Sequence, residues 1–346
     1  MSNNELLQTI RQMPKIDLHR HLEGSLRLET LLAIAQEYGI SLPTYDIEGL
    51  RPFVQIVPGE PRNWQQFLGK FQVLRQFYRS RTIIQRVTRE VIADAAADNV
   101  KYMELRFTPQ ALNNLVRCDY QEVVAWVCDA VEQVTSELDI QVTLILSMNR
   151  HESVEIGDQV LEAAIHFADR GVVGLDLAGQ EAGHSGLPFR ALFERAKAEG
   201  FGITIHAGEW AGASNVREAV EILGADRVGH GIRTIEDPTL FDLLQTRGTV
   251  LEVCPTSNVQ SGAVEGFGVH PLIRLYQLGL RTTINTDDPL ICNISLSDEI
   301  SNVVKGMPPL TLDDVKRNIL TAANAAFLPA DRRAALVAQY QAWLYS

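Results

Sequence analysis

The sequence is poor in cysteine, and its four cysteines lack the spacing of a metal site or of a disulfide framework. Cys118, Cys128, Cys254 and Cys292 are scattered over 346 residues without a CxxC pair. Cysteine-ligated zinc sites and redox motifs need closely spaced cysteines. We therefore expect reduced and mostly buried thiols, as is typical of a cytoplasmic protein.

Long apolar runs and an excess of basic residues are also missing. No stretch approaches the roughly 18 consecutive apolar residues of a membrane span. Residues 1–12 show no basic region followed by an apolar run, so no signal peptide is visible. The 31 Lys and Arg against 43 Asp and Glu give a net charge of −12, which argues against nucleic acid or an anionic membrane as partner. A cytoplasmic protein is expected, and the sequence does not indicate its oligomeric state.

What the sequence contains is a regular alternation of short apolar runs with longer helical patterns such as residues 120–138 and 153–169. Eight strand candidates span residues 16–21, 100–107, 141–147, 172–177, 202–206, 227–230, 249–253 and 280–285. Nearly continuous apolar strands that alternate with helices are typical of parallel sheets covered on both faces. The pattern predicts an α/β fold: one TIM-type (β/α)8 barrel domain over residues 1–346, with a helical insertion after the first strand and extra C-terminal helices.

The main alternative is an open doubly wound sheet, which commonly binds its ligand through a glycine-rich phosphate turn. No GxGxxG sequence follows the first strand candidate. Residues 26–98 form the predicted helical insertion, in which residues 63–71 carry apolar groups at helical spacing. This segment either packs as a helix on the barrel or acts as a lid that excludes water from a site.

The most informative feature is a pair of histidines one residue apart, His19 and His21, in the segment KIDLHRHLEG at residues 15–24. Side chains on a strand alternate faces, so both imidazoles project to the same side. Two imidazoles at the end of a strand suit a borderline-soft cation, above all zinc. We therefore predict a metal site there.

Further polar residues stand at or just after the ends of other strand candidates: Gly179, His206, Glu209, His230, Asp287 and Asp288. In a barrel these ends share one face, where barrel enzymes place their chemistry. A zinc ion held by three histidines and an aspartate lowers the pKa of bound water toward 7, and a nearby glutamate outside the metal shell suits acid–base catalysis. The sequence thus predicts metal-assisted hydrolysis at an electron-poor carbon.

Each of these residues also has a purely structural interpretation. Glu209 could be an acid favoured by a helix N-terminus, but its place three residues after His206 favours catalysis. Asp287 and Asp288 could form a turn or cap before a proline; because neighbouring side chains diverge, one can ligate the metal while the other faces the substrate. His230 lies between two glycines, which leave room for a reacting group.

The other histidines are expected to be structural. His166 lies in the middle of a helical pattern, whereas His151, His184 and His270 occupy loops or helix starts. Surface positions are more common there than catalytic ones, so we predict that none of the four belongs to the site.

Six segments in this order, LHRHLEG, DLAGQE, HAGE, GHG, CPTSNVQ and INTDDP, resemble the signature segments of adenosine deaminases in the amidohydrolase superfamily. The resemblance runs from about residue 14 to residue 329 and is closest in pattern to the bacterial enzymes. It implies hydrolysis of adenosine or 2′-deoxyadenosine to inosine or 2′-deoxyinosine and ammonia. Cytidine-type deaminases are a different family, whose CxxC motif is absent here.

The resemblance also implies roles for individual residues. One zinc ion per chain would be held by His19, His21, His206 and Asp287. Glu209 would protonate purine N1 during attack at C6, His230 would take the proton from the zinc-bound water, and Asp287 would orient that water. Asp288 would hydrogen-bond N7 and Gly179 would offer its backbone N–H to N3, while Glu23 and His21 would also contact the substrate.

Two positions depart from the family pattern. Glu23 stands where many adenosine deaminases have Asp for the ribose 5′-hydroxyl, and Gln180 replaces the usual Asp of the DLAG segment. Adenine deaminases and aminodeoxyfutalosine deaminases often have Glu at the first position, so adenine or a modified nucleoside such as N6-methyladenosine is the alternative substrate. The GHG segment favours a nucleoside, because adenine deaminases commonly have Asp-His-Gly there. An acidic site without a phosphate loop disfavours AMP.

Two other functions are less consistent with the sequence. A binuclear amidohydrolase needs a bridging Lys or Glu on the fourth strand, and residues 172–177 offer neither. A catalytically silent binding protein should have lost a ligand or the acid, and all of them are present.

Overall fold

The computed structural model describes residues 3–345, and eight parallel strands lie at its centre in the order β1 to β8. Their bounds are β1 Lys15–His21, β2 Val100–Phe107, β3 Gln141–Asn149, β4 Val172–Ala178, β5 Gly202–Ala207, β6 Arg227–His230, β7 Val250–Val253 and β8 Arg281–Ile284. Each predicted strand is present, with ends displaced by at most two residues. The predicted (β/α)8 barrel is therefore confirmed.

The barrel closes between its first and last strands through the residues that follow β8. Asp287 N donates to His19 O and His21 N donates to Asp287 O, both at 2.8 Å, and Arg20 forms a parallel bridge with Asp287. The loop after β8 is thereby fixed against the end of β1, which brings residues from both ends of the chain together.

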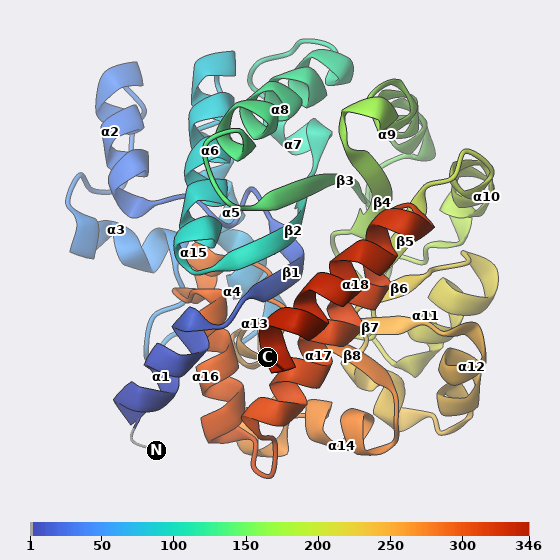
Figure 1. Cartoon of the computed structure of the whole chain (residues 1–346). Helices are drawn as coiled ribbons and strands as arrows, with labels where there is room; N and C mark the ends of the chain where they lie inside the picture. The colour runs from blue at the N-terminus through green and yellow to red at the C-terminus, as the bar shows by residue number, and fades with distance from the viewer. Residues whose placement is uncertain (1–2, 346) are drawn as a thin grey trace.

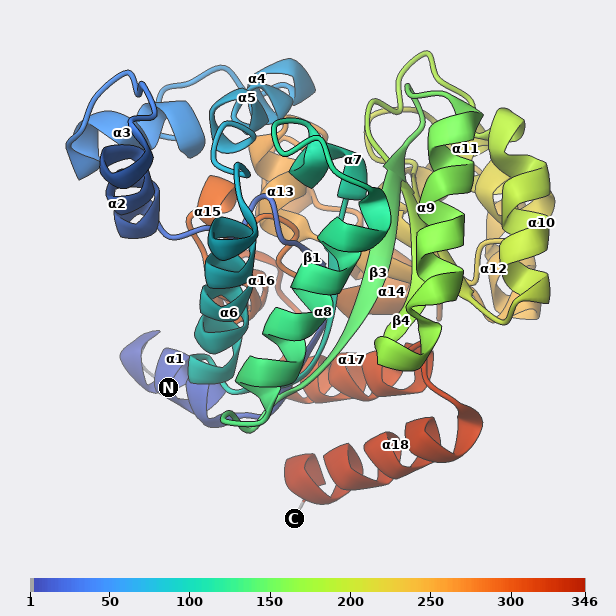
Figure 2. The same ribbon diagram turned by 90° about the horizontal axis from the view of Figure 1, so that it is seen from above.

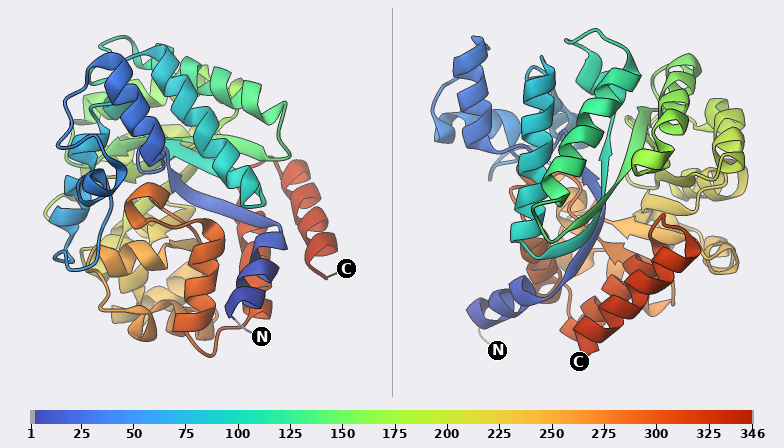
Figure 3. Two further views of the ribbon diagram at one scale, coloured as in Figure 1. Left: turned by 90° about the vertical axis from the view of Figure 1, so that its left-hand side faces the viewer. Right: turned by 45° about the horizontal axis from the view of Figure 1, so that its top comes forward.

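The helices surround the strands, and the extra elements lie at opposite ends of the barrel (Figures 1 and 2). Helices α8 (Tyr120–Thr135), α9 (Val154–His166), α10 (Arg190–Ala198) and α12 (Thr239–Arg247) belong to the outer ring. Figure 3 shows α1 (Asn3–Gln12) and the C-terminal end of the chain on the same side of the molecule. Within the described residues, no helix is long and apolar enough to cross a membrane.

The predicted insertion consists of four short helices followed by a regular barrel helix. Its helices are α2 Leu28–Tyr38, α3 Ile47–Val54, α4 Trp64–Gly69, α5 Phe71–Leu74 and α6 Arg81–Ala97. The last of these packs against β2 and α8, so it is the crossover helix between the first two strands. Figure 2 shows the other four at the end of the barrel opposite α17 (Leu312–Ala325) and α18 (Ala330–Tyr345).

The barrel interior contains a group of paired charged side chains, here named the ion-pair layer: Glu104, Arg106, Arg227 and Glu252. Arg227 contacts both glutamates, and its guanidinium carbon lies 3.5 Å from the centre of the Phe327 ring. The four side chains are almost completely buried. Buried charges of this kind are tolerated when each is paired and hydrogen-bonded.

Candidate active site

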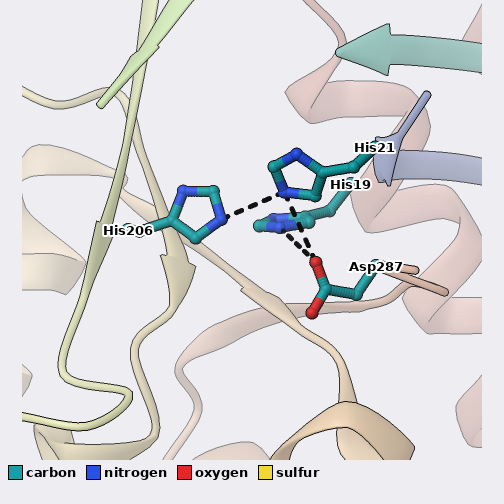
Figure 4. Close-up of side chains that lie close together, drawn as sticks. All are labelled: His19, His21, His206 and Asp287. Carbon is teal, nitrogen blue, oxygen red and sulfur yellow. Dashed lines mark hydrogen bonds and ion pairs between the residues drawn. The ribbon is translucent and has the colours of Figure 1, made fainter. Parts of the chain in front are cut away.

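Four predicted ligands converge at the C-terminal ends of the strands. His19 and His21 come from β1, His206 comes from β5 on the opposite side, and Asp287 follows β8 (Figure 4). Their ligand atoms all lie within 4.8 Å of one another. His21 Nε2 is 3.2 Å from His206 Nε2, and Asp287 Oδ1 is 3.2 Å from His19 Nε2. The structure therefore brings together the residues that the sequence predicts as metal ligands.

Carboxylates behind two of the histidines orient them toward the centre of this group. His19 Nδ1 lies 2.8 Å from Glu252 Oε2, and His206 Nδ1 lies 2.9 Å from Asp176 Oδ1. A carboxylate at Nδ1 holds the proton there and leaves the lone pair of Nε2 free for a metal ion. His19 Nε2 is buried without a hydrogen-bond partner. Such a nitrogen is well suited to bind a cation.

The separations between the ligand atoms match those expected around zinc. With Zn–N and Zn–O distances of about 2.0–2.1 Å, neighbouring corners of a tetrahedron lie roughly 3.3 Å apart. Burial acts to raise the pKa of Asp287, but the close contact with His19 and the charges of the adjacent histidines hold it well below its usual range. Three imidazoles and an ionised carboxylate thus fit one divalent ion.

Cys254 lies close to this group but is a poor metal ligand. Its sulfur, His230 and Asp287 form a second set of potential ligand atoms within 4.8 Å. Burial raises the pKa of the thiol well above its ordinary value, and the sulfur lies 3.6 Å from Glu252 O as a hydrogen-bond donor. Cys128 and Cys292 are also buried and Cys118 is partly buried, and none of the four forms a disulfide. The prediction of mostly buried free thiols is confirmed.

Glu209 and His230 lie next to the metal-ligand group. Glu209 follows β5, and its Oε2 is 3.4 Å from Nε2 of His230, which ends β6. Burial, together with the negative charge of Asp287, raises the pKa of Glu209 well above its usual value. A protonated carboxyl in this position can serve as a general acid.

Two residues of the site have left-handed backbone conformations that are uncommon outside glycine. The φ angles are 59° at His230 and 61° at Asp287. Such strain persists only where the surrounding structure enforces it, and it occurs frequently at functional positions. Here it turns each side chain into the pocket at the point where its strand ends.

Glu181 is a functional candidate that was not predicted from the sequence. Its carboxylate accepts hydrogen bonds from four consecutive backbone N–H groups, those of Gly208, Glu209, Trp210 and Ala211, at 2.5–3.0 Å. It therefore fixes the turn that carries Glu209. The signal was available, because Glu181 is the last residue of the DLAGQE segment.

The metal-ligand group lies at the base of a pocket of about 360 Å³. Helices α4 and α5 supply part of the wall, including Trp64, Phe67 and Phe71, and the Trp64 and Trp210 rings are 6.2 Å apart. Side chains between Trp64 and Phe71 thus cover the site.

Glu23 and Asp288 face this pocket with unused oxygen atoms. Glu23 Oε1 accepts from Thr108 N at 2.7 Å, whereas Glu23 Oε2 and Asp288 Oδ1 are buried without a hydrogen-bond partner. Burial raises the pKa of Glu23 to about 7 and, with the charges of Asp287 and Glu23, raises that of Asp288 well above its usual range. Both side chains are therefore available for a polar ligand.

Two glycines make space around these groups. A Cβ at Gly24 would lie 1.8 Å from Asp288 Oδ1, so only glycine fits there. Gly179 has a φ of 85°, and a Cβ on it would lie 2.8 Å from His151 Nδ1. The Gly179 backbone consequently lies at the pocket wall, together with Gln180. A planar ligand can approach the backbone closely at this point.

The structure corrects one prediction about the remaining histidines. His166 is exposed, and His151 is exposed at the rim of the pocket. His270, predicted to be at the surface, is instead almost completely buried and hydrogen-bonded to Asn258 and to the backbone of Leu272. The packing of the segment before α14 (Leu272–Gln277) buries its ring.

The known proteins that resemble this chain include deaminases and an amidohydrolase. A family model described as Adenosine deaminase matches residues 14–343. An adenosine deaminase of Clostridium perfringens is 34% identical over 315 residues, covering 91% of this chain and 94% of that protein. The structure of an adenine deaminase from Arthrobacter aurescens superposes with a TM-score of 0.84 at 27% identity, covering 96% and 100% of the two chains. An amidohydrolase structure from Burkholderia ambifaria with bound Zn gives a TM-score of 0.82 at 26% identity, covering 98% and 93%.

Proposed function

Because the chain belongs to the adenosine deaminase family, we propose that it hydrolyses adenosine and 2′-deoxyadenosine to inosine and 2′-deoxyinosine with release of ammonia. The observation that carries this proposal is the placement of a buried, protonatable Glu209 beside the metal-ligand group. Hydrolysis at a ring carbon needs a nucleophile on one side and a proton donor for the adjacent ring nitrogen. The pocket brings these two requirements together.

One zinc ion would be held by His19, His21, His206 and Asp287, whose geometry and charge fit such an ion. When bound, zinc lowers the pKa of water and supplies a hydroxide nucleophile at neutral pH. Metal analysis should give close to one zinc per chain, and His206→Ala should remove most of it. Two metal ions per chain, or full zinc content in His206→Ala, would contradict the assignment.

The protein groups then act on the purine ring. Glu209 donates its proton to N1. Asp288, whose raised pKa keeps it protonated, can donate a hydrogen bond to N7, and the Gly179 backbone N–H can donate to N3. His21 also lines the substrate pocket, and His230 and Asp287 lie where the attacking oxygen approaches. N1, N3 and N7 would thus each meet a donor, which orients C6, the carbon that carries the amino group, toward the nucleophile.

Glu23 bears on the choice between nucleoside and base. Its free Oε2 can accept a hydrogen bond from a ribose 5′-hydroxyl, which favours adenosine over adenine. The alternative substrates are adenine, N6-methyladenosine and aminodeoxyfutalosine. Ammonia or amine release from all of these, together with 2′-deoxyadenosine and AMP, should be measured side by side. The highest kcat/KM on adenosine or 2′-deoxyadenosine supports the proposal, and a preference for adenine contradicts it.

We further propose that the enzyme acts in cytoplasmic purine metabolism. The support is the composition, with a net charge of −12 and reduced thiols, and the nucleoside chemistry of the pocket. Fractionation of cells that express the natural protein, with the deaminase activity as the marker, tests this setting.

A further inference from the structure

A chain of hydrogen bonds leads from buried His270 through Asn258 to His230. The backbone N–H of Leu272 points to His270 Nδ1 at 3.1 Å. A backbone N–H can only donate, so this nitrogen must accept and carries no proton. Burial lowers the pKa of His270 to about 3, which keeps the ring neutral. Its single ring proton therefore resides on Nε2.

This proton fixes the orientation of the Asn258 side chain. His270 Nε2 lies 3.3 Å from Asn258 Oδ1 and donates to it, because an amide oxygen can only accept. The amide nitrogen of Asn258 must then face the opposite way. It lies 3.0 Å from His230 Nδ1 and 3.4 Å from Glu209 Oε1. Asn258 itself is completely buried in α13 (Pro255–Gln260), so water does not compete for these bonds.

An amide NH₂ group can only donate, so Nδ1 of His230 must accept from it. We propose that Asn258 and His270 are positioning residues that fix the proton of neutral His230 on Nε2. The ring then presents an N–H, and not a lone pair, toward Glu209 Oε2 and the attacking oxygen.

This inference rests on the proposed function and changes one expectation within it. Neutral His230 has no free lone pair directed at the attacking oxygen, so it would orient that oxygen by donating a hydrogen bond. The proton of the water would be lost to solvent when the metal ion converts it to hydroxide, and not to His230. Glu209 Oε2 lies 3.4 Å from His230 Nε2, and Glu209 keeps its own proton for purine N1. Asn258 and His270 thereby make His230 a hydrogen-bond donor to the attacking oxygen, while Glu209 remains the proton donor to the purine.

The tautomer can be measured directly by long-range ¹H–¹⁵N NMR of zinc-loaded protein containing ¹⁵N-labelled histidine. His230 and His270 should show a protonated Nε2. His19 and His206, which bind Glu252 and Asp176 through Nδ1, should show a protonated Nδ1 and so provide an internal contrast. A protonated Nδ1 on neutral His230 would overturn the proposal, whatever substrate the enzyme accepts.

Variants test whether Asn258 and His270 cause this tautomer. Asn258→Asp offers only acceptors and should move the His230 proton to Nδ1. His270→Leu should release the Asn258 amide and weaken the preference, whereas His270→Gln keeps a donor and should preserve it. The exposed residue His166, changed to Gln, is the matched control and should leave the His230 signals unchanged. An unchanged His230 tautomer in folded Asn258→Asp would contradict the causal role.

Kinetics provide the second measurement. When the His230 proton moves to Nδ1, the ring can no longer donate a hydrogen bond from Nε2 to the charged attacking oxygen. Loss of a hydrogen bond to a charged group lowers a rate by roughly 10–150-fold. We expect such a loss of kcat in Asn258→Asp, with KM within about threefold of wild type. A wild-type kcat in this variant would refute the role of Asn258. If wild-type enzyme deaminates no purine at all, the proposed function fails, but the NMR result on the tautomer is unaffected.

Discussion

Glu209 in the pocket and Glu252 in the barrel interior are both almost completely buried, but their surroundings differ in charge. Glu252 is contacted by Arg106 and Arg227 at 2.8 and 2.6 Å and by His19, and these groups outweigh burial to hold its pKa well below the usual range. Glu209 has no cationic partner among the described residues, and burial with neighbouring carboxylates raises its pKa well above that range. Equal burial therefore leaves one carboxyl ionised and the other protonated.

The difference separates groups that support the fold from groups that are available for chemistry. In the ion-pair layer, charges compensate one another, so removal of one partner leaves the other buried and unpaired. At the pocket, burial and neighbouring carboxylates raise the pKa of Glu209 and Asp288 well above the usual range, so these two groups retain protons that a ligand can use. Perturbed carboxyls of this second kind are typical of active sites.

The largest expected effect is on turnover at the pocket. Glu209→Gln can still hydrogen-bond purine N1 but cannot supply a proton, so kcat should fall by about 10²–10⁴-fold. Zinc content and the free energy of unfolding should not fall, because a neutral amide replaces a protonated carboxyl. Steady-state ammonia release and denaturant unfolding measure the two quantities. More than a tenth of wild-type kcat in this variant would mean that Glu209 is not the acid.

A substitution in the ion-pair layer should lower the stability of the protein, in contrast to Glu209→Gln. Arg227→Met leaves Glu104 and Glu252 without their shared cation and should lower the free energy of unfolding by about 3–5 kcal/mol. Urea unfolding at neutral pH measures this. Arg190→Met, at a surface i,i+4 pair with Glu194, is the control and should cost no more than about 1 kcal/mol. Equal losses of unfolding free energy in the two variants would mean that the ion-pair layer stabilises the fold no more than a surface ion pair does.

A smaller effect is expected at Glu23. A hydrogen bond to a charged acceptor contributes about 1.5–3 kcal/mol, or roughly 10–150-fold in kcat/KM. Glu23→Ala should therefore reduce kcat/KM for adenosine by that factor and leave the low activity on adenine nearly unchanged. Parallel kinetics with both substrates test this, with Glu23→Gln as the conservative comparison. Equal losses on the two substrates would rule out a contact specific to the sugar.

The smallest expected effect is on how the free energy of unfolding changes with pH. Burial raises the pKa of Glu299 to about 8, although Thr256 donates to its carboxylate from both N and Oγ1. Between pH 4.5 and 8 the folded state holds a proton that the unfolded state lacks, so wild-type stability falls as pH rises through this window. Between pH 5 and 6, Glu299→Gln should remove a slope of about 1.4 kcal/mol per pH unit. Identical slopes in urea unfolding of the two proteins would contradict the shift.

The barrel and the convergence of the three histidines could be predicted from the sequence because both depend on local patterns, whereas the choice of Asp287 over Asp288 as a candidate ligand came from the family resemblance. Short apolar runs mark the strands, and the alternation of faces along a strand places His19 and His21 together. The position of His206 near the end of β5, and that of Asp287 just after β8, are likewise local properties. Barrel topology then brings these distant segments to one face.

The ion-pair layer and the burial of His270 could not be predicted in the same way. Arg106 and Glu252 are separated by 146 positions, and nothing in either strand specifies that they meet. The environment of His270 depends on how one loop packs against α13, which its own sequence does not encode. Tertiary contacts between charged residues thus require the structure, even where the fold is evident.

The closure of the barrel at Asp287 has a consequence for how the molecule is made. The hydrogen bonds that join the end of β8 to β1 involve the backbone of His19, His21 and Asp287, which also carry three of the four metal-ligand side chains. During synthesis, a ribosome must complete most of the chain before this seam can form. With the ion bound as proposed, metal capture would report that the two ends of the chain have met, and we expect a truncated product to lack the ion as well as the last strand.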